Sequence, residues 1–144
     1  MTHFQLVEKF HKSFVVHPVT LCWIWQCNLS DQGYGRLYID QATPRKLAHR
    51  FAYELYKGPI PDSLTLDHLC RVRSCVNPSH LEAVTTKVNV LRGQGPTAQN
   101  ARQKVCPRGH LYSKENTLVT TKRGRSCREC NNIKKVIQRI TAVW

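Results

Sequence analysis

Acidic residues are scarce in this chain, which has nine Asp and Glu against 22 Lys and Arg in 144 residues and a formal net charge of +13. Such a balance favours a polyanionic partner, of which nucleic acid is the commonest. Charge alone would also fit an anionic membrane surface or a merely solvated basic surface. Composition alone therefore does not identify a function, and a motif with defined chemistry is needed.

Long apolar runs are also missing, and no stretch approaches the ~18 consecutive apolar residues of a transmembrane helix. The N-terminal sequence MTHFQLVEKFHKSF has charges throughout, without the apolar core and cleavage site of a signal peptide. We therefore expect no membrane association and a reducing compartment, the cytoplasm or, in a eukaryote, the nucleus.

The apolar fraction is modest, at 41%, with a single Met, so a large hydrophobic core is not expected to hold the fold alone. Small domains in this position add disulfides or a structural metal. Seven cysteines, an odd number, accompany histidines at short spacings, and a reducing compartment disfavours disulfides. The pattern therefore predicts metal binding.

The periodicity of the chain predicts a small α+β protein. It has four sections: an N-terminal helical and extended segment (1–20), a central section of strands and helices (21–92), a polar linker (93–104) and a basic C-terminal module (105–144). Within them we expect helices before Pro18 and over 47–58, 80–91 (at least from Thr85) and 131–140, and strands over 22–27, 33–40 and Leu64–Leu69.

A first cysteine and histidine cluster lies in the central section. Cys70, Cys75 and His80 have the spacing C-x4-C-x4-H, and thiolate and imidazole are the usual ligands of tetrahedral Zn²⁺. A fourth ligand must come from elsewhere in the sequence, and either Cys22 or Cys27 can supply it.

Three polar residues around this cluster have no structural duty of their own. Asp67 and His68 precede Cys70, and Asn89 follows about twenty residues on. A neutral imidazole can take a proton from water, and carboxylate and amide oxygens are ligands for Mg²⁺. This combination suits hydrolysis of a phosphodiester, although His68 as a zinc ligand and Asn89 as an ordinary helix residue are alternatives.

A second cluster follows near the C-terminus. Cys106, His110, Cys127 and Cys130 have the spacing C-x3-H-x16-C-x2-C, which predicts a second structural zinc site. Since four protein ligands are available for each cluster, neither zinc needs the open position that catalytic zinc requires.

The order His, Cys, Cys, His, Asn from His68 to Asn89 resembles the His-Cys box of ββα-metal homing endonucleases. The wider text CWIW…GYGR…AHRFAYEL…GPIP…LDHLCRVRSCVNPSHLEAVT is similar to HNH endonucleases of the phage type, from about Cys22 to Cys130. The resemblance implies a zinc-stapled ββα-metal (His-Me finger) core and a metal-dependent DNA endonuclease. Its setting would be the cytoplasm of a bacterial or phage-infected cell, in a homing, restriction or other phage role.

Position by position, the resemblance implies His68 as the general base, with Asn89 and Asp67 as ligands of a catalytic Mg²⁺ or Mn²⁺. Cys22 matches the remote fourth ligand of the first zinc. His49 and Arg50 match a recurring pair near the site. The second cluster is spaced more widely than in His-Cys box enzymes and fits the C-terminal finger of the phage relatives.

Basic residues predict the DNA-binding surface. Residues 101–144 carry eleven Lys and Arg against two Glu, so +9 of the +13 lies there and suits contacts to phosphates. The strand with Tyr34, Arg36 and Tyr38 is the candidate for reading bases. Arg36, Arg45, Arg50 and Arg73 are alternatives for an arginine that steadies the cleaved phosphate. The candidates in the C-terminal module are Arg108, Lys122, Arg123, Arg125, Arg128, Lys134, Lys135 and Arg139.

Two functional classes remain at this point. The first is an endonuclease acting on double-stranded DNA, with two structural zincs; a twofold dimer on a palindromic site and a monomeric nickase both fit the sequence. The second is a non-enzymatic zinc module that binds nucleic acid. It accounts for the charge and both clusters but leaves Asp67, His68 and Asn89 unexplained.

Overall fold

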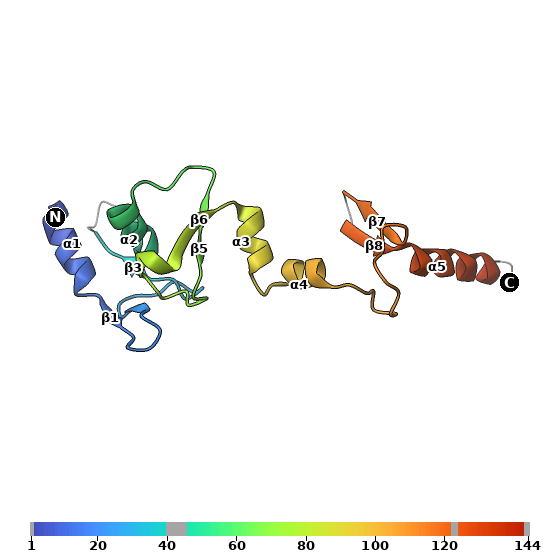
Figure 1. Cartoon of the computed structure of the whole chain (residues 1–144), viewed down its shortest axis with the longest axis horizontal. Helices are drawn as coiled ribbons and strands as arrows, with labels where there is room; N and C mark the ends of the chain where they lie inside the picture. The colour runs from blue at the N-terminus through green and yellow to red at the C-terminus, as the bar shows by residue number, and fades with distance from the viewer. Residues whose placement is uncertain (1, 40–45, 122–123, 143–144) are drawn as a thin grey trace. The chain divides into compact units, whose positions relative to one another are not determined.

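The computed structural model describes residues 2–39, 46–121 and 124–142, which divide into two compact units, Met1–Gly93 and Gln94–Trp144 (Figure 1). Each unit is considered by itself. All strand pairs described are two-stranded and antiparallel, and they join β1 to β2, β3 to β4, β5 to β6 and β7 to β8. No helix in the described residues is long and apolar enough to cross a bilayer.

The described residues of the first unit form three helices, six strands and one 3-10 turn. In chain order they are α1 (His3–His11), β1 (Phe14–Val16), β2 (Trp23–Trp25), β3 (Arg36–Leu37), β4 (Lys46–Leu47), α2 (Ala48–Lys57), β5 (Thr65–His68), η1 (Pro78–His80), β6 (Leu81–Val84) and α3 (Thr86–Arg92).

A small core holds the first unit together. Its buried side chains are Phe10, Trp25, Leu37, Ala48, Phe51, Ala52 and Val76. Phe10 is fully buried, so α1 is part of this core. A Thr2–Gln5 capping box begins that helix. Two of the seven core side chains are alanines, which fits the expectation that so small a core needs a metal staple.

Helix α2 agrees with the predicted amphipathic helix. Ala48, Phe51 and Ala52 form its buried stripe, and Gly58 ends it with a φ of +94°, a conformation that suits glycine. Gly35 lies against the core because a Cβ there would come within 2.8 Å of Trp25 Cγ.

The segment from His80 to Leu91 differs from its predicted helix. Leu81–Val84 form β6, which pairs with β5 so that His68 lies opposite Leu81, and helix α3 begins only at Thr86. Leu81 and Val84 are both buried, and this spacing of three residues fits a helix as well as a strand, so pairing with β5 rather than a sequence signal makes this segment a strand. Thr85 caps α3 through a hydrogen bond from Val88 N.

Other predicted elements are shorter or displaced. The strand predicted over 33–40 is reduced to Arg36–Leu37, and residue 40 lies outside the described residues. Leu69, predicted to end this strand, lies just after β5 and is 50% exposed.

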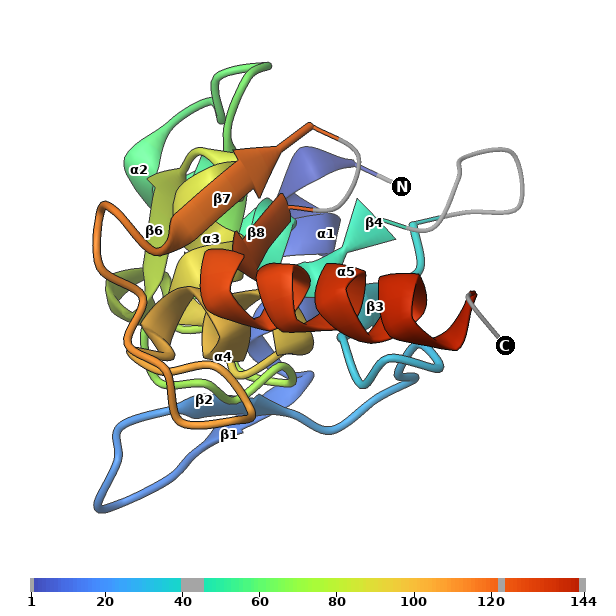
Figure 2. The same ribbon diagram turned by 90° about the vertical axis from the view of Figure 1, so that its right-hand side faces the viewer.

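The second unit contains α4 (Pro96–Arg102), β7 (Thr117–Thr120), β8 (Gly124–Cys127) and α5 (Arg128–Thr141). Helix α4 occupies part of the predicted linker. Strands β7 and β8 lie side by side, and α5 continues directly from β8 (Figure 2). The predicted basic C-terminal helix is therefore present and begins three residues earlier than expected.

Candidate active site and metal centres

The first cluster brings together Cys22, Cys70, Cys75 and His80, whose ligand atoms all lie within 4.8 Å of one another. His80 Nδ1 is 3.5 Å from Cys22 Sγ and 3.7 Å from Cys75 Sγ. Zn–S and Zn–N bonds of about 2.3 and 2.05 Å at a tetrahedral angle would give a separation of about 3.6 Å. The four side chains therefore fit a tetrahedral zinc ion.

Backbone pairing explains why Cys22 reaches this cluster. Trp25 N donates to Ser74 O at 3.0 Å, and Val76 N donates to Trp23 O at 2.8 Å. These bonds hold β2 against the loop before Asn77. Cys27 lies beyond the paired stretch, is exposed and does not belong to the cluster.

Asn77 fixes the other side of the same loop. Its Oδ1 accepts from Ser79 N at 2.9 Å, and its Nδ2 donates to Leu21 O at 2.7 Å, next to Cys22. Asn77 thus links the segment of one ligand to the turn that carries His80. Burial raises the pKa of the Cys75 thiol to about 12, so a bound dication is what would hold it as thiolate.

The second cluster joins Cys106, His110, Cys127 and Cys130, again within 4.8 Å. Cys106 Sγ lies 3.5 Å from His110 Nδ1 and 3.6 Å from Cys130 Sγ, separations that also suit tetrahedral zinc. Gly109, with a φ of +85°, makes the turn that returns His110 to Cys106. Cys127 ends β8 and Cys130 lies in the first turn of α5.

His68 is buried at the end of β5, 7% exposed. Its Nε2 lies 3.1 Å from the carbonyl oxygen of Cys75. Because a carbonyl only accepts hydrogen bonds, Nε2 carries the proton and Nδ1 of the neutral ring is left as an acceptor. Burial lowers the pKa of His68, against the opposing effects of the Cys75 carbonyl and Asp67, so the ring is neutral at neutral pH.

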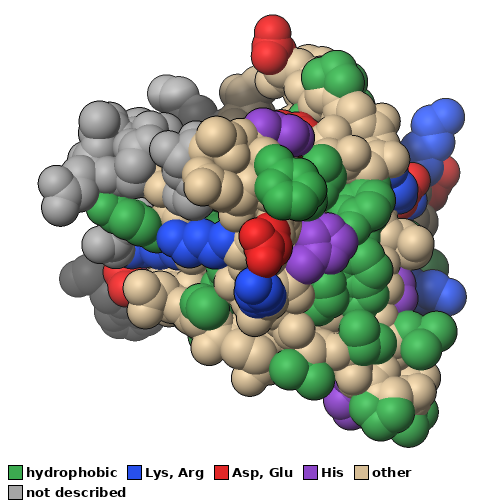
Figure 3. Space-filling model, turned by 90° about the vertical axis from the view of Figure 1, so that its left-hand side faces the viewer, with side chains coloured by type: hydrophobic (Ala, Val, Ile, Leu, Met, Phe, Trp, Pro, Cys, Tyr) green, Lys and Arg blue, Asp and Glu red, His purple; other side chains and the backbone are tan. Residues whose placement is uncertain are grey.

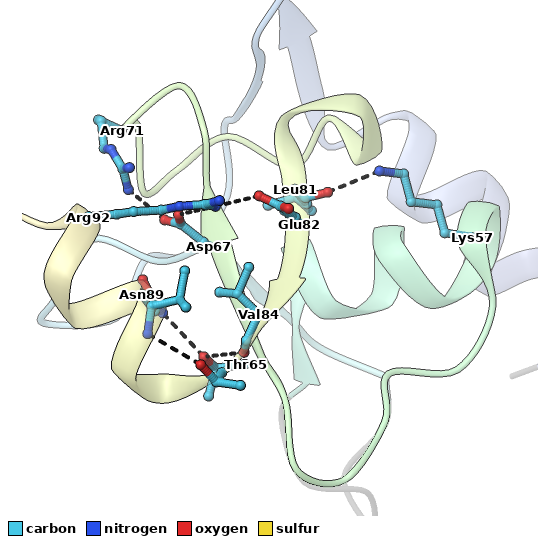
Figure 4. Close-up of polar contacts among 11 residues, drawn as sticks. Lys57, Thr65, Asp67, Arg71, Leu81, Glu82, Val84, Asn89 and Arg92 are labelled. Atoms are coloured by element: carbon cyan, nitrogen blue, oxygen red, sulfur yellow. Dashed lines mark hydrogen bonds and ion pairs between the residues drawn. The ribbon is translucent and has the colours of Figure 1, made fainter.

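Asp67 lies on the opposite face of β5, with an exposure of only 2%. Arg71 Nη1 donates to its Oδ1 at 2.5 Å, and Arg92 Nη1 approaches its Oδ2 at 3.4 Å (Figure 4). Arg92 also pairs with Glu82. The carboxylate is thus a buried negative charge compensated by two cationic side chains.

Asn89 lies on α3, which packs against β5. Its Nδ2 donates to Thr65 Oγ1 at 3.3 Å, and Figure 4 shows the side chain directed toward this strand. Thr65 and Asp67 are two residues apart on one strand and share its face. The structure therefore places Asn89 on the side of β5 that carries Asp67.

His49 lies next to His68. Their ring centroids are 4.9 Å apart, and Tyr34 contacts both rings at 5.3 and 5.7 Å. Burial lowers the pKa of His49 to about 3, with further lowering by His68 and Arg50, so this ring is neutral as well. His49 Nδ1 is buried and has no hydrogen-bond partner among the described residues.

A cavity of about 470 Å³ opens beside these rings. Tyr34, Arg36, His49 and Arg50 are among its lining residues. Four residues that the sequence marked as candidates for catalysis or DNA contact thus line one hollow. Arg73 lies nearby, with its guanidinium 5.7 Å from the centre of the Tyr34 ring and donating to Gln32 O at 3.0 Å.

The candidate DNA-binding residues of the second unit surround its metal cluster. Arg108, Arg125 and Lys134 line a hollow with Cys106, Cys127 and Cys130. Arg125 stacks on Tyr112, 4.0 Å from the ring centre. Lys135 and Arg139 are exposed on α5, as is Arg128 at its start. Arg45, Lys122 and Arg123 lie outside the described residues.

The charge of the first unit is not gathered on the face seen in Figure 3. Hydrophobic side chains cluster on that face, and Lys and Arg side chains are scattered among them. This face is a poor candidate for contact with a polyanion.

Sequence reasoning missed Arg71 and Arg92, the arginines that contact Asp67. Arg92 follows Asn89 by three residues, so its position on the same face of α3 was a usable signal. Arg71 lies in a loop, where no periodicity relates it to Asp67. Its contact could be found only from the structure.

Comparison with known proteins gives one family match and three similar phage proteins. Residues 46–91 match the family model described as HNH endonuclease. The gene 5.3 protein of Enterobacteria phage T3 is 39% identical over 44 residues, which are 31% of this chain and 44% of that protein. Protein 7.7 of Escherichia phage T7 is 29% identical over 103 residues, 67% of this chain and 76% of that protein.

Protein 2.8 of Escherichia phage T7 is 32% identical over 68 residues, 47% of this chain and 45% of that protein. The chain thus spans less than half the length of two of these relatives. No solved structure matches it. The matched segment contains His49, Asp67, His68 and Asn89, and the resemblance inferred from the sequence is confirmed there. Residues 46–91 of this chain are thus similar to the HNH endonuclease family.

Proposed function

We propose that the protein is a metal-dependent DNA endonuclease whose active site is formed by β5, β6 and α3 as a ββα-metal core. The observation that carries the proposal is the hydrogen bond from His68 Nε2 to Cys75 O, 3.1 Å long. It leaves the other ring nitrogen unprotonated, as a general base requires. The family match over residues 46–91 supports the same activity.

In this account, His68 Nδ1 takes the proton of the attacking water. Its neutral ring is kept in one orientation by the Cys75 carbonyl and by contact with His49 and Tyr34. Orienting a base in this way contributes about 10²–10⁴ to the rate of such reactions. His49 is a positioning residue here, because its contact is with His68.

Asp67 and the Asn89 side chain are the residues that would hold a divalent cation. Their oxygens are the donors that Mg²⁺ and Mn²⁺ prefer, and the buried Asp67 carboxylate already attracts cationic groups. A bound Mg²⁺ would stabilise negative charge on the scissile phosphate and on the leaving 3′ oxygen. Neither residue is needed by the two cysteine and histidine clusters.

The two clusters are assigned to structural zinc. Each offers four ligand side chains, which leaves no open position for substrate. The first cluster also serves the active site, because Cys75 contributes Sγ to the cluster and its carbonyl oxygen to His68. Metal binding and orientation of the base are thus joined in one residue.

DNA contacts are assigned to both units. The cavity lined by Tyr34, Arg36 and Arg50 also includes His49, whose ring contacts His68, and it suits the strand around the cleaved phosphate. Arg125, Lys134 and Lys135 of the second unit suit phosphate contacts that give affinity without sequence selection. Because three phage proteins are similar, a phage-infected bacterial cell is the proposed setting.

Supercoiled plasmid tests this proposal. Zinc-loaded protein should convert the plasmid to nicked or linear DNA when Mg²⁺ is added and leave it intact without Mg²⁺. A chelator is avoided, since it would also remove the structural zinc. Asp67→Asn and Asn89→Ala should lose cleavage while still binding DNA, and Glu8→Gln, which removes one exposed negative charge on α1, is the matched charge control.

Linear product would indicate two cooperating active sites, whereas nicked product alone would indicate one site per event. Wild-type protein that binds DNA tightly but cuts none at any Mg²⁺ concentration would reject the nuclease assignment. It would favour a non-enzymatic zinc module.

A further inference from the structure

The Asp67 carboxylate is enclosed by positive charge to a degree that the proposed metal site does not explain. It is 2% exposed and contacts the guanidinium groups of Arg71 and Arg92, one on each oxygen. A buried carboxylate needs compensation, and these two side chains supply it here. Both arginines are partly exposed, at 44% and 39%, so their guanidinium groups lie at the border between Asp67 and solvent.

Arg71 occupies an unusual backbone conformation. Its φ is +60°, in the left-handed region, which only one other non-glycine residue of the described chain shares. Glycine would adopt this conformation without steric strain. Strained residues of this kind gather at functional sites, so the side chain of Arg71 is the feature that needs explaining.

The two arginines differ in how firmly they are held. Arg92 pairs with Glu82 as well as Asp67, so it keeps a partner if the carboxylate is taken by another cation (Figure 4). For Arg71, Asp67 is the only ion-pair partner found among the described residues. Arg71 is therefore the side chain that would be released.

We propose that Arg71 is the arginine that contacts the cleaved phosphate, and that it rests on Asp67 until a divalent cation takes its place. This inference depends on the proposed function, because it uses Asp67 as a metal ligand. Two like charges cannot share one carboxylate at short range without repulsion. The freed guanidinium is a planar donor suited to bidentate contact with phosphate.

This arrangement couples the cation to the substrate. Arg71 competes with the cation in the absence of DNA, and it binds the phosphate once the cation is present. Cation and DNA should therefore each strengthen the binding of the other, in equal measure. The arginine also keeps the buried carboxylate neutralised before the cation binds.

Mn²⁺ titration of the zinc-loaded protein by calorimetry, without DNA, tests the competition. Arg71→Gly is the main variant, because glycine accepts the φ of +60° and the backbone should not be perturbed. It should bind Mn²⁺ about threefold or more tightly than wild type, whereas Asp67→Asn should lose this binding. Arg71→Gln removes the charge without changing the backbone freedom, and should also bind more tightly. Lys12→Gln, which removes one charge on α1, should match wild type.

The second measurement is DNA affinity in the uncut state, with His68→Ala added to every protein. Mn²⁺ should raise the DNA affinity of the His68→Ala protein, and Arg71→Gly should reduce that gain about tenfold. Unchanged or weaker Mn²⁺ binding in both Arg71 variants would overturn the proposal and leave Arg71 as a structural partner of Asp67. If Asp67→Asn leaves Mn²⁺ binding unchanged, Asp67 is not a ligand of the cation. The proposed function then fails together with this proposal.

Discussion

Replacing Cys22 by serine should remove one of two zinc ions and destabilise the first unit, while replacing Cys27 should do neither. Cys22 is 1% exposed, and its Sγ lies 3.5 Å from His80 Nδ1, in a cluster that joins β2 to the loop of Cys70 and Cys75. Cys27 is exposed and outside the cluster. The pair is therefore a matched test of one ligand.

The expected size of the effect follows from the small core. Structural zinc contributes about 10–16 kcal/mol of apparent binding free energy in small zinc domains. The net stability of a domain is about 5–15 kcal/mol, so loss of a large part of the zinc contribution is enough to unfold the unit. Core burial cannot compensate, because two of the seven core side chains are alanines.

Zinc content by mass spectrometry and thermal unfolding by circular dichroism measure both consequences. Wild type and Cys27→Ser should hold two zinc ions per chain, and Cys22→Ser should hold one, with loss of the unfolding transition of the first unit. Two zinc ions and an unchanged transition in Cys22→Ser would refute the reasoning. Loss of one zinc ion from Cys27→Ser instead would show that Cys27, and not Cys22, is the fourth ligand.

Three further predictions concern packing, pH and DNA contact. Gly35→Ala places a Cβ 2.8 Å from Trp25 Cγ and should lower stability by about 1–3 kcal/mol in thermal denaturation. The pKa of His49 is lowered to about 3, so the unfolded chain binds the extra proton first as pH falls below about 6.5. Stability should therefore fall toward pH 3 by about 1.4 kcal/mol per unit from this group, and the wild-type slope should exceed that of His49→Gln by this amount. Lys134→Ala and Lys135→Ala should weaken DNA binding at all sequences, and each should reduce the salt slope by about one; unchanged slopes would remove α5 from the DNA contact.

The ligand residues of both clusters could be proposed from sequence because thiolate and imidazole spacing is set by the metal. Spacing alone left both Cys22 and Cys27 open, and only the family resemblance favoured Cys22. The pairing of β2 with residues 74–76, which brings Cys22 to the cluster, is not revealed by any spacing. The helix predicted from His80, or at least from Thr85, begins at Thr86, so only its extension over residues 80–84 was wrong. There the strand β6 is stabilised by pairing with β5, a contact between segments distant in sequence.

The residues of the candidate active site also differ in how far the sequence could predict them. Asp67, His68 and Asn89 stood out because their chemistry had no other explanation. The tautomer of His68 and the contact of Arg71 with Asp67 required the structure, because a backbone carbonyl and a loop side chain leave no periodic mark. Residue types therefore indicated which side chains are candidates for catalysis. They did not indicate the surrounding groups that orient those side chains and balance their charge.

The central claim is that His68 is the general base of a DNA endonuclease. Single-turnover cleavage of plasmid DNA by zinc-loaded His68→Ala, at protein concentrations that saturate the DNA, tests it most directly. The account predicts a rate about 10²–10⁴ below wild type with unchanged DNA affinity. A His68→Ala protein that cuts as fast as wild type would contradict it.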